Sequence, residues 1–214
     1  MEFKLKVLSA QKETHDTMYI RIEKPANFRF VPGHAAMLSI NFPSLVKEIR
    51  PFTFTATNSD PFLEFIIKSY PSSPITKEFH ALKKDDELIM HSVFGAHRYK
   101  GSGLFIAAGS GITPFLAMFR QLRKDNALSG IMLLYSNKTQ SDIIKEEELK
   151  SLLGDNCIFT LTREKKLGYK YGRINQKFLQ DHIQSKKLNY YICGSEQFVF
   201  DMKNIITELQ SGQL

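Results

Sequence analysis

Cysteine and tryptophan are scarce in this sequence, and long apolar runs are missing. The 214 residues include no tryptophan and only two cysteines, Cys157 and Cys193. These thiols are too few for an iron–sulfur cluster, which normally takes about four thiolates. With no apolar leader core at the N-terminus, so little cysteine favours a reducing, cytoplasmic setting. No stretch approaches the ~20 apolar residues that cross a bilayer, so we expect no membrane association.

Negative charge is also in deficit. The chain has 22 acidic and 29 basic residues, a net charge of +7. Such an excess steers acidic partners toward a protein, although an ordinary solvated surface explains the same composition. There is no long Lys/Arg run and no aromatic-interleaved motif, so we expect no nucleic-acid binding. The six histidines show no ligand spacing such as His-x-x-x-His, so we expect no metal site.

The first hundred residues have the period of short strands. Apolar and polar residues alternate in several runs that are separated by turns such as Val31-Pro32-Gly33. Short strands at this spacing predict an antiparallel barrel or sandwich. The expected strands are 4–10, 17–23, 35–40, 52–57, 62–68 and 87–91, with one short helix at 75–82.

The second half of the chain alternates buried strands with amphipathic helices. Residues 104–108 form a continuous apolar run, as expected for a strand that is covered on both faces. Alternation of this kind predicts a parallel α/β sheet. The turn-rich segment at 99–103 marks the boundary, which gives predicted domains at 1–99 and 100–214. The other expected strands are 131–135, 157–161 and 190–193, and the helices are 114–124, 141–153 and 198–209.

The clearest chemical signal is the loop Ala108-Gly109-Ser110-Gly111-Ile112-Thr113-Pro114. It follows a buried strand and opens a helix, with Thr113 as a candidate N-cap and Pro114 in the first turn. Glycines allow close approach of the backbone to a pyrophosphate, and a helix N-terminus attracts anions. The alternative is a plain tight turn, because Pro114 stands where the third glycine of the usual dinucleotide fingerprint falls.

Six motifs, in order along nearly the whole chain, resemble those of the ferredoxin–NADP⁺ reductase superfamily. Each motif alone is a weak or moderate signal, whereas the order is specific. The motifs are Phe30-Val31-Pro32-Gly33-His34, Arg50-Pro51-Phe52-Thr53, Ser73-Pro74-Ile75-Thr76, Phe94-Gly95, the loop 108–114 and Tyr191-Ile192-Cys193-Gly194-Ser195. The resemblance implies an N-terminal antiparallel six-stranded flavin-binding β-barrel followed by a Rossmann-like parallel α/β nucleotide-binding domain. It also implies hydride transfer between NAD(P)H and bound FAD, with FMN less favoured, in a cleft between the domains.

The resemblance assigns flavin-binding roles to the first domain. Arg50 is expected to pair with flavin phosphate, Phe52 to lie on the isoalloxazine and Thr53 to act at flavin N5 as a catalytic residue. Thr76 is expected to hold the pyrophosphate. The alternatives are a surface ion pair for Arg50, a core aromatic for Phe52 and a simple N-cap for Thr76. The remaining expected flavin-binding residues are Pro51, Ser73 and Ile75, with backbone groups of Ile67 and Lys68.

The resemblance also assigns roles in the second domain. Cys193 is expected near nicotinamide C4 as the second catalytic residue, with inert packing as its alternative. Thr162 and Arg163 resemble the grip on a 2′-phosphate, which favours NADPH over NADH, although an exposed basic hairpin explains them as well. Either Tyr169 or Tyr171 is expected to stack on adenine. The other expected nucleotide-binding residues are Gly109, Ser110, Gly111, Thr113, Pro114 and Gly194.

This sequence departs from the family pattern in several places. Phe52 replaces the usual tyrosine, so stacking is kept and a hydroxyl is lost. The residues Gln213 and Leu214 stand where many relatives carry a terminal aromatic over the flavin. We therefore expect the flavin face to be more open.

The composition and the resemblance together leave three functions. The first is a monomeric reductase for an acidic electron carrier, a flavodoxin or a ferredoxin, which the positive charge favours. The second is an NAD(P)H-dependent reductase of free flavin or ferric chelates. The third is an electron-transfer subunit that works only in a larger complex, although such subunits often add a cysteine cluster that this chain lacks.

Overall fold

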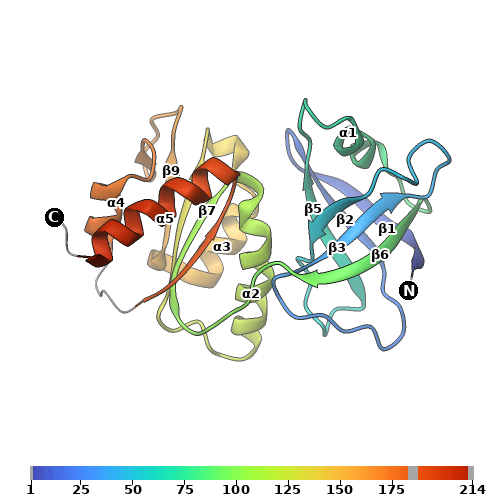
Figure 1. Cartoon of the computed structure of the whole chain (residues 1–214), viewed down its shortest axis with the longest axis horizontal. Coiled ribbons are helices and arrows are strands. Elements are labelled where there is room, and N and C mark those ends of the chain that lie inside the picture. Colours follow the sequence, from blue (N-terminus) through green and yellow to red (C-terminus); the bar gives the residue numbers. More distant parts are fainter. Residues whose placement is uncertain (1, 183–187, 212–214) are drawn as a thin grey trace. The chain divides into compact units, whose positions relative to one another are not determined.

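The computed structural model describes residues 2–182 and 188–211, and the chain separates into two compact units (Figure 1). One unit contains Met1–Tyr99 and Thr113–Lys124, and the other contains Lys100–Ile112 and Asp125–Leu214. The predicted domain division between residues 99 and 100 stays a prediction. Residues 213 and 214, on which the expected open flavin face depends, lie outside the described ranges.

The first unit is built on a six-stranded antiparallel sheet. The strand order is β4-β3-β6-β1-β2-β5, and a bridge between Phe54 and Phe65 brings the two ends of that order together. The backbone N–H of Thr55 donates to the carbonyl of Glu64 at 2.9 Å in the same place, so the sheet closes on itself. This confirms the predicted six-stranded antiparallel architecture. The elements are β1 Phe3–Thr14, β2 Thr17–Glu23, β3 His34–Ile40, β4 Arg50–Thr53, β5 Phe62–Lys68, α1 Pro74–Ala81, β6 Glu87–Gly95 and α2 Thr113–Lys124.

Phenylalanine rings fill the inside of this sheet. Phe54 is fully buried and stacks on Phe30 at a centroid distance of 4.4 Å. The centroid of the Phe65 ring lies 5.1 Å from that of Phe54. Strand alternation places the aliphatic residues Ile20 and Ile22 in the same core. Phe54 and Phe65, whose bridge closes the sheet, thus also belong to the hydrophobic core, and their packing fixes the register of β4 and β5 together.

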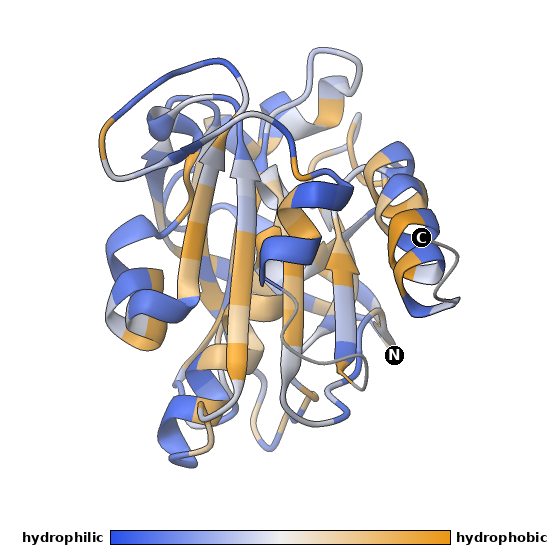
Figure 2. Ribbon diagram, turned by 90° about the vertical axis from the view of Figure 1, so that its left-hand side faces the viewer, coloured by the Kyte–Doolittle hydropathy of each residue, from blue (hydrophilic) through white to orange (hydrophobic). Residues whose placement is uncertain are grey.

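The second unit is a five-stranded parallel sheet with the order β10-β9-β8-β7-β11. Figure 2 shows apolar residues concentrated along the central strands. One face packs against α4 and α5, where Leu134 belongs to a buried cluster with Leu179 and Met202. This confirms the predicted parallel α/β architecture. The elements are β7 Gly103–Ala108, β8 Ile131–Asn137, α3 Glu146–Leu153, β9 Cys157–Leu161, β10 Lys170–Tyr171, α4 Gln176–His182, β11 Asn189–Cys193 and α5 Glu196–Ser211, with 3₁₀ turns η1 Gly109–Ile112, η2 Gln140–Asp142 and η3 Gly154–Asn156.

The structure corrects two predicted elements and adds two more. The strand expected at 52–57 is β4 at Arg50–Thr53, because the chain then leaves β3 and crosses to β5. The helix expected at 141–153 begins only at Glu146, since Lys145 has the left-handed φ of 54° and separates it from η2. Strand β10 and helix α4 were not predicted. Within the described ranges, no helix has the length and apolarity that a membrane crossing requires.

Candidate cofactor-binding sites

Strand β4 presents the predicted flavin-binding motif at the end of the sheet order, where β3 is its ladder partner. Phe52 is half-buried and meets Phe79 of α1 edge to face, with centroids 4.8 Å apart. The guanidinium of Arg50 is 46% exposed and lies 3.1 Å from the Glu48 carboxylate. An exposed pair of this kind is worth at most about 1 kcal/mol, so a flavin phosphate can displace Glu48. Half-buried Thr53 ends the strand, so all three side chains remain accessible at one edge.

The N-terminus of α1 holds the second predicted flavin contact. Ser73 is the N-cap residue and Pro74 follows it, so Thr76 lies inside the first turn and is not the cap. The Thr76 hydroxyl donates to the Ser73 carbonyl at 2.7 Å and accepts from the Tyr70 N–H at 3.0 Å. Its side chain therefore shapes the loop 70–76, and Ile75 beside it is buried. The Ser73 N–H donates to the Tyr70 carbonyl and the Thr76 N–H to the Ser73 carbonyl, each at 3.0 Å, and Pro74 has no N–H. The positive end of the helix dipole, more than free donors, therefore suits a phosphate here.

The predicted backbone contacts at the end of β5 are partly in use. His80 Nε2 donates to the Ile67 carbonyl at 3.0 Å. The ammonium of Lys68 lies 2.8 Å from the Asp16 carboxylate. Burial raises the pKa of Asp16, but the hydrogen bond and charge of Lys68 outweigh burial and hold that pKa below its usual value. The Lys68 side chain is thus committed to Asp16, and the expected flavin contacts there stay predictions.

The dinucleotide loop is the most constrained feature of the second unit. It follows β7 directly as the turn η1, and the Tyr135 hydroxyl donates to the Gly109 carbonyl at 2.8 Å. A Cβ at Gly111 would lie 2.3 Å from the Cys193 carbonyl oxygen and 2.7 Å from the Gly194 nitrogen. Only glycine allows this approach. Two motifs that are more than 80 residues apart, at 109–111 and 193–194, are therefore packed backbone to backbone.

Other predicted members of this loop follow in the chain. Ser110 is half-buried within η1. Thr113 and Pro114 begin helix α2 and are both buried, and Thr113 is 7% exposed.

A cavity of about 600 Å³ lies at the carboxyl ends of the parallel strands. Residues from four strand ends line it, among them Ala108 at the end of β7, Ser136 in β8, Thr162 after β9 and Ser195 after β11. Ligands of open α/β sheets bind in this position. Of its polar lining, only Thr162 was among the predicted cofactor-binding residues.

Arg173 is a candidate functional residue that the sequence analysis missed. Among the described residues that line the cavity it is the only arginine or lysine. Both Arg173 and the predicted Arg163 are exposed, but Arg163 is not part of the lining. The predicted adenine partner Tyr171 is 58% exposed, with the Lys165 ammonium 4.9 Å from its ring centroid. Gly172-Arg173 directly follows β10, and this position could have indicated the residue. It was missed because β10 has only two residues, too few to show an alternating pattern in the sequence.

Cys193 ends β11 beside the dinucleotide loop. Burial raises the pKa of its thiol to about 11, and a hydrogen bond from the Gly194 backbone only partly offsets this. The thiol is therefore neutral near pH 7. Its geometry suits a packing or positioning role, and its expected catalytic role stays a prediction.

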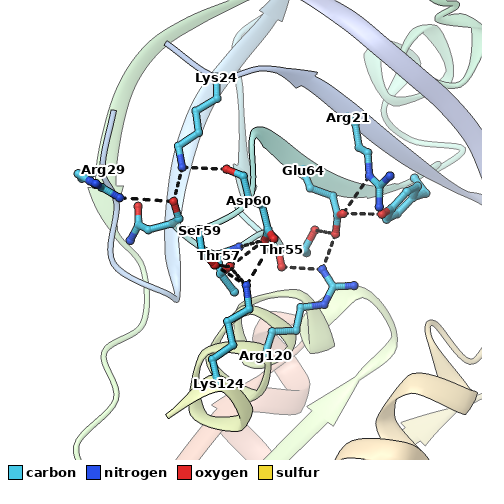
Figure 3. Close-up of polar contacts among 12 residues, drawn as sticks. Arg21, Lys24, Arg29, Thr55, Thr57, Ser59, Asp60, Glu64, Arg120 and Lys124 are labelled. Atoms are coloured by element: carbon cyan, nitrogen blue, oxygen red, sulfur yellow. Dashed lines mark hydrogen bonds and ion pairs between the residues drawn. The ribbon is translucent and has the colours of Figure 1, made fainter. Parts of the chain in front are cut away.

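Helix α2 is fastened to the first unit by charged groups (Figure 3). Arg120 donates to Glu64 Oε1 at 2.5 Å and to the Thr55 carbonyl at 2.7 Å. Glu64 is only 2% exposed and also accepts from the Tyr19 and Thr55 hydroxyls. Burial raises the Glu64 pKa, but the Arg120 charge and these hydrogen bonds hold it below the usual value. The C-terminal half of the helix that follows the dinucleotide loop is thus tied to the barrel by a buried ion pair.

Comparison with known proteins identifies a family for each of the two units. Residues 2–91 match the family described as FAD-binding domain, and residues 105–204 match the family described as oxidoreductase NAD-binding domain. The chain belongs to the ferredoxin–NADP⁺ reductase-like superfamily of FAD- and NAD(P)-binding oxidoreductases. The resemblance seen in the sequence is confirmed, and so are FAD and a nicotinamide dinucleotide as the cofactor classes.

Two known sequences and one solved structure are similar to this chain over most of its length. The ferredoxin–NAD(P)⁺ reductase component of the naphthalene 1,2-dioxygenase system of Pseudomonas putida is 23% identical over 203 residues, which are 90% of this chain and 61% of the relative. NADH-cytochrome b5 reductase 2 of Mycosarcoma maydis is 26% identical over 162 residues, 68% of this chain and 46% of the relative. The chain thus spans only part of the length of these relatives. The crystal structure of a Neisseria gonorrhoeae ferredoxin NADP⁺ reductase with bound FAD and NADP has the same fold, with a TM-score of 0.84 at 17% identity over 97% of this chain and 91% of that one.

Proposed function

We propose that the protein is an NAD(P)H-dependent, FAD-containing reductase that passes electrons to a carrier protein such as a ferredoxin or a flavodoxin. The observation that carries the proposal is the packing of Gly111 against the Cys193–Gly194 backbone beside strand ends that surround a cavity of about 600 Å³. A glycine loop built this closely onto the sheet edge leaves room for a dinucleotide.

The residues of both units fit the two cofactors. When bound, FAD and the nicotinamide ring supply the hydride chemistry, and the protein supplies binding and alignment. Arg50 holds a flavin phosphate with its forked donors, since its present partner Glu48 is half-exposed and weakly bound. Phe52 supports the flavin ring and Thr53 offers its hydroxyl to the ring edge. The first turn of α1, shaped by Thr76, receives the pyrophosphate.

We propose NADPH as the preferred donor. The support is Arg173, a guanidinium in the lining of a cavity that is otherwise neutral apart from Asp201. Arginine recognises phosphate through two parallel hydrogen bonds, which suits a 2′-phosphate. Arg163 then belongs to the exposed basic hairpin and acts less directly on the nucleotide.

We propose an acidic carrier protein as the electron acceptor. The two relatives described above are named for ferredoxin and for cytochrome b5. The net charge of +7 supports an acidic carrier through electrostatic steering.

The test is steady-state oxidation of NADPH and NADH by the FAD-loaded protein, with ferricyanide, ferredoxin, flavodoxin and cytochrome b5 as acceptors. We expect turnover with ferricyanide, and with at least one carrier a rate that falls steeply between low and high salt. A rate with every carrier that is independent of salt contradicts the carrier proposal. No oxidation of either donor, even with ferricyanide, contradicts the reductase itself.

A further inference from the structure

Asn137 is an orphaned buried amide at the end of β8. It is 5% exposed, and its Oδ1 and Nδ2 are the only buried side-chain polar atoms in the described part of the chain that have no hydrogen-bond partner. Buried amides in folded proteins are normally paired, because desolvation without a partner is costly. A polar group that violates this rule needs an explanation, and functional sites are where such violations concentrate.

The backbone around Asn137 does not need the amide. The Asn137 carbonyl accepts from the Thr162 N–H at 2.9 Å and lies 3.3 Å from the Thr162 hydroxyl. Leu161 of β9 is its register partner in the sheet. The strand end is therefore held by main-chain contacts, and the side chain is free of a structural task.

The sheet register places Asn137 at the dinucleotide loop. Strand β7 ends at Ala108, opposite Ser136, so Asn137 lies one residue beyond the last β7–β8 pair. Because side chains alternate, Asn137 shares a sheet face with Tyr135, whose hydroxyl binds the Gly109 carbonyl. Asn137 is thus at the carboxyl edge of the sheet on the face over which Gly109 begins the loop, while Ser136 lines the cavity on the other face.

We propose that Asn137 is a nucleotide-binding residue whose amide hydrogen-bonds a sugar hydroxyl of the nicotinamide dinucleotide, an inference that rests on the proposed function. The chemistry selects the hydroxyl. Both a donor and an acceptor of Asn137 are unpaired, and a hydroxyl both accepts and donates. A phosphate oxygen only accepts, so it would leave Oδ1 without a partner. The cost of the orphaned amide in the free protein is recovered when the nucleotide binds.

The test is Asn137→Leu, which keeps the number and branching of the side-chain heavy atoms and removes both polar atoms. We expect the dissociation constant for NADP⁺ or NAD⁺, measured calorimetrically with no turnover, to rise by about 10-fold or more, as the loss of two hydrogen bonds implies. FAD affinity should not change.

The matched control is Asn189→Leu at the opposite edge of the sheet. The Asn189 amide donates to the Ser102 carbonyl at 3.0 Å, so this variant should lose stability and keep its nucleotide affinity. Asn137→Asp is the second variant, because it keeps the shape and places a carboxylate beside an anionic ligand, and it should weaken nucleotide binding at least as much.

Two results would overturn the inference about Asn137. One is unchanged nucleotide affinity in both Asn137 variants, and the other is an equal loss of FAD and nucleotide affinity in both variants, which would mean that the amide supports the fold and not the nucleotide. Either leaves the proposed function standing if the wild-type protein binds dinucleotide. A wild-type protein that binds neither NADP⁺ nor NAD⁺ overturns the inference and the proposed function together.

Discussion

Replacing Arg120 by methionine should destabilise the protein strongly and in a way that depends on pH. Arg120 faces Glu64 at 2.5 Å, and the Glu64 side chain is only 2% exposed. Methionine keeps most of the aliphatic packing of the arginine side chain and removes its charge. What remains is a carboxylate buried in the barrel wall without its main counter-charge.

The magnitude follows from the partners that Glu64 keeps. Breaking a buried ion pair by removal of one partner costs about 3–5 kcal/mol. Glu64 retains the hydroxyls of Tyr19 and Thr55 and a longer contact of 3.4 Å with Arg21 Nε, so the low end applies, about 3 kcal/mol at pH 7. For a chain of this length that corresponds to a fall in melting temperature of roughly 6–12 °C.

The pH dependence distinguishes a lost charge from lost packing. In the wild-type protein the Glu64 pKa is lowered, so the carboxylate stabilises the fold above its unfolded pKa, and this contribution is lost as the pH falls through the folded pKa. Without Arg120, burial dominates and the variant's Glu64 pKa rises above the unfolded value. The variant therefore gains relative stability by protonation as the pH falls. The gap between the two proteins should shrink between pH 7 and about pH 4.5.

The assay is urea unfolding at both pH values, followed by far-UV circular dichroism because the chain has no tryptophan. Arg123→Met is the control, since Arg123 is exposed on the same helix and should change stability by less than about 0.5 kcal/mol. A loss below about 1 kcal/mol for Arg120→Met, or an equal loss at both pH values, would refute the reasoning.

Three further predictions concern the nucleotide-binding unit. Gly111→Ala should abolish nucleotide binding and destabilise the fold, because its Cβ would lie 2.3 Å from a backbone oxygen. Gly109→Ala meets open space and should cost only about 1 kcal/mol of stability for its φ of 52°. Calorimetry and thermal melts compare the two variants, and equal effects refute the packing argument. Arg173→Ala should raise the Michaelis constant for NADPH at least about 10-fold and change that for NADH little. Arg163→Ala should raise the Michaelis constant for NADPH less than Arg173→Ala does. A larger effect of Arg163→Ala would restore Arg163 as the phosphate ligand. Since burial raises the Cys193 pKa from 9.0 to about 11, its thiolate should be about 100-fold rarer than in the unfolded chain. Iodoacetamide should therefore label Cys193 slowly at pH 7.5 and much faster after denaturation. Fast labelling of the folded protein contradicts the burial of this thiol.

The sequence predicts the parts of this protein that depend on local pattern. Alternation over 62–68 and the apolar run at 104–108 predicted strands, because burial on one or both faces sets the period of the residues. The dinucleotide loop was equally visible, since glycines and a helix start are local features. Its packing on Cys193 was not, because that contact joins residues more than 80 positions apart.

Long-range pairing explains what the sequence did not predict. The shortened β4 follows from the bridge between Phe54 and Phe65, which no local pattern announces. Arg173 reaches the cavity only because a strand of two residues pairs with β9. The pairing of Arg120 with Glu64 spans 56 positions, so its charged groups looked like ordinary surface residues in the sequence.

The most direct test of the central claim is an anaerobic spectral titration. The purified protein, reconstituted with FAD, is mixed with stoichiometric NADPH or NADH while the flavin absorbance near 450 nm is followed. We predict a yellow protein whose absorbance bleaches rapidly with at least one donor, faster with NADPH. A folded protein that takes up neither FAD nor FMN, or a bound flavin that neither donor reduces, contradicts the account.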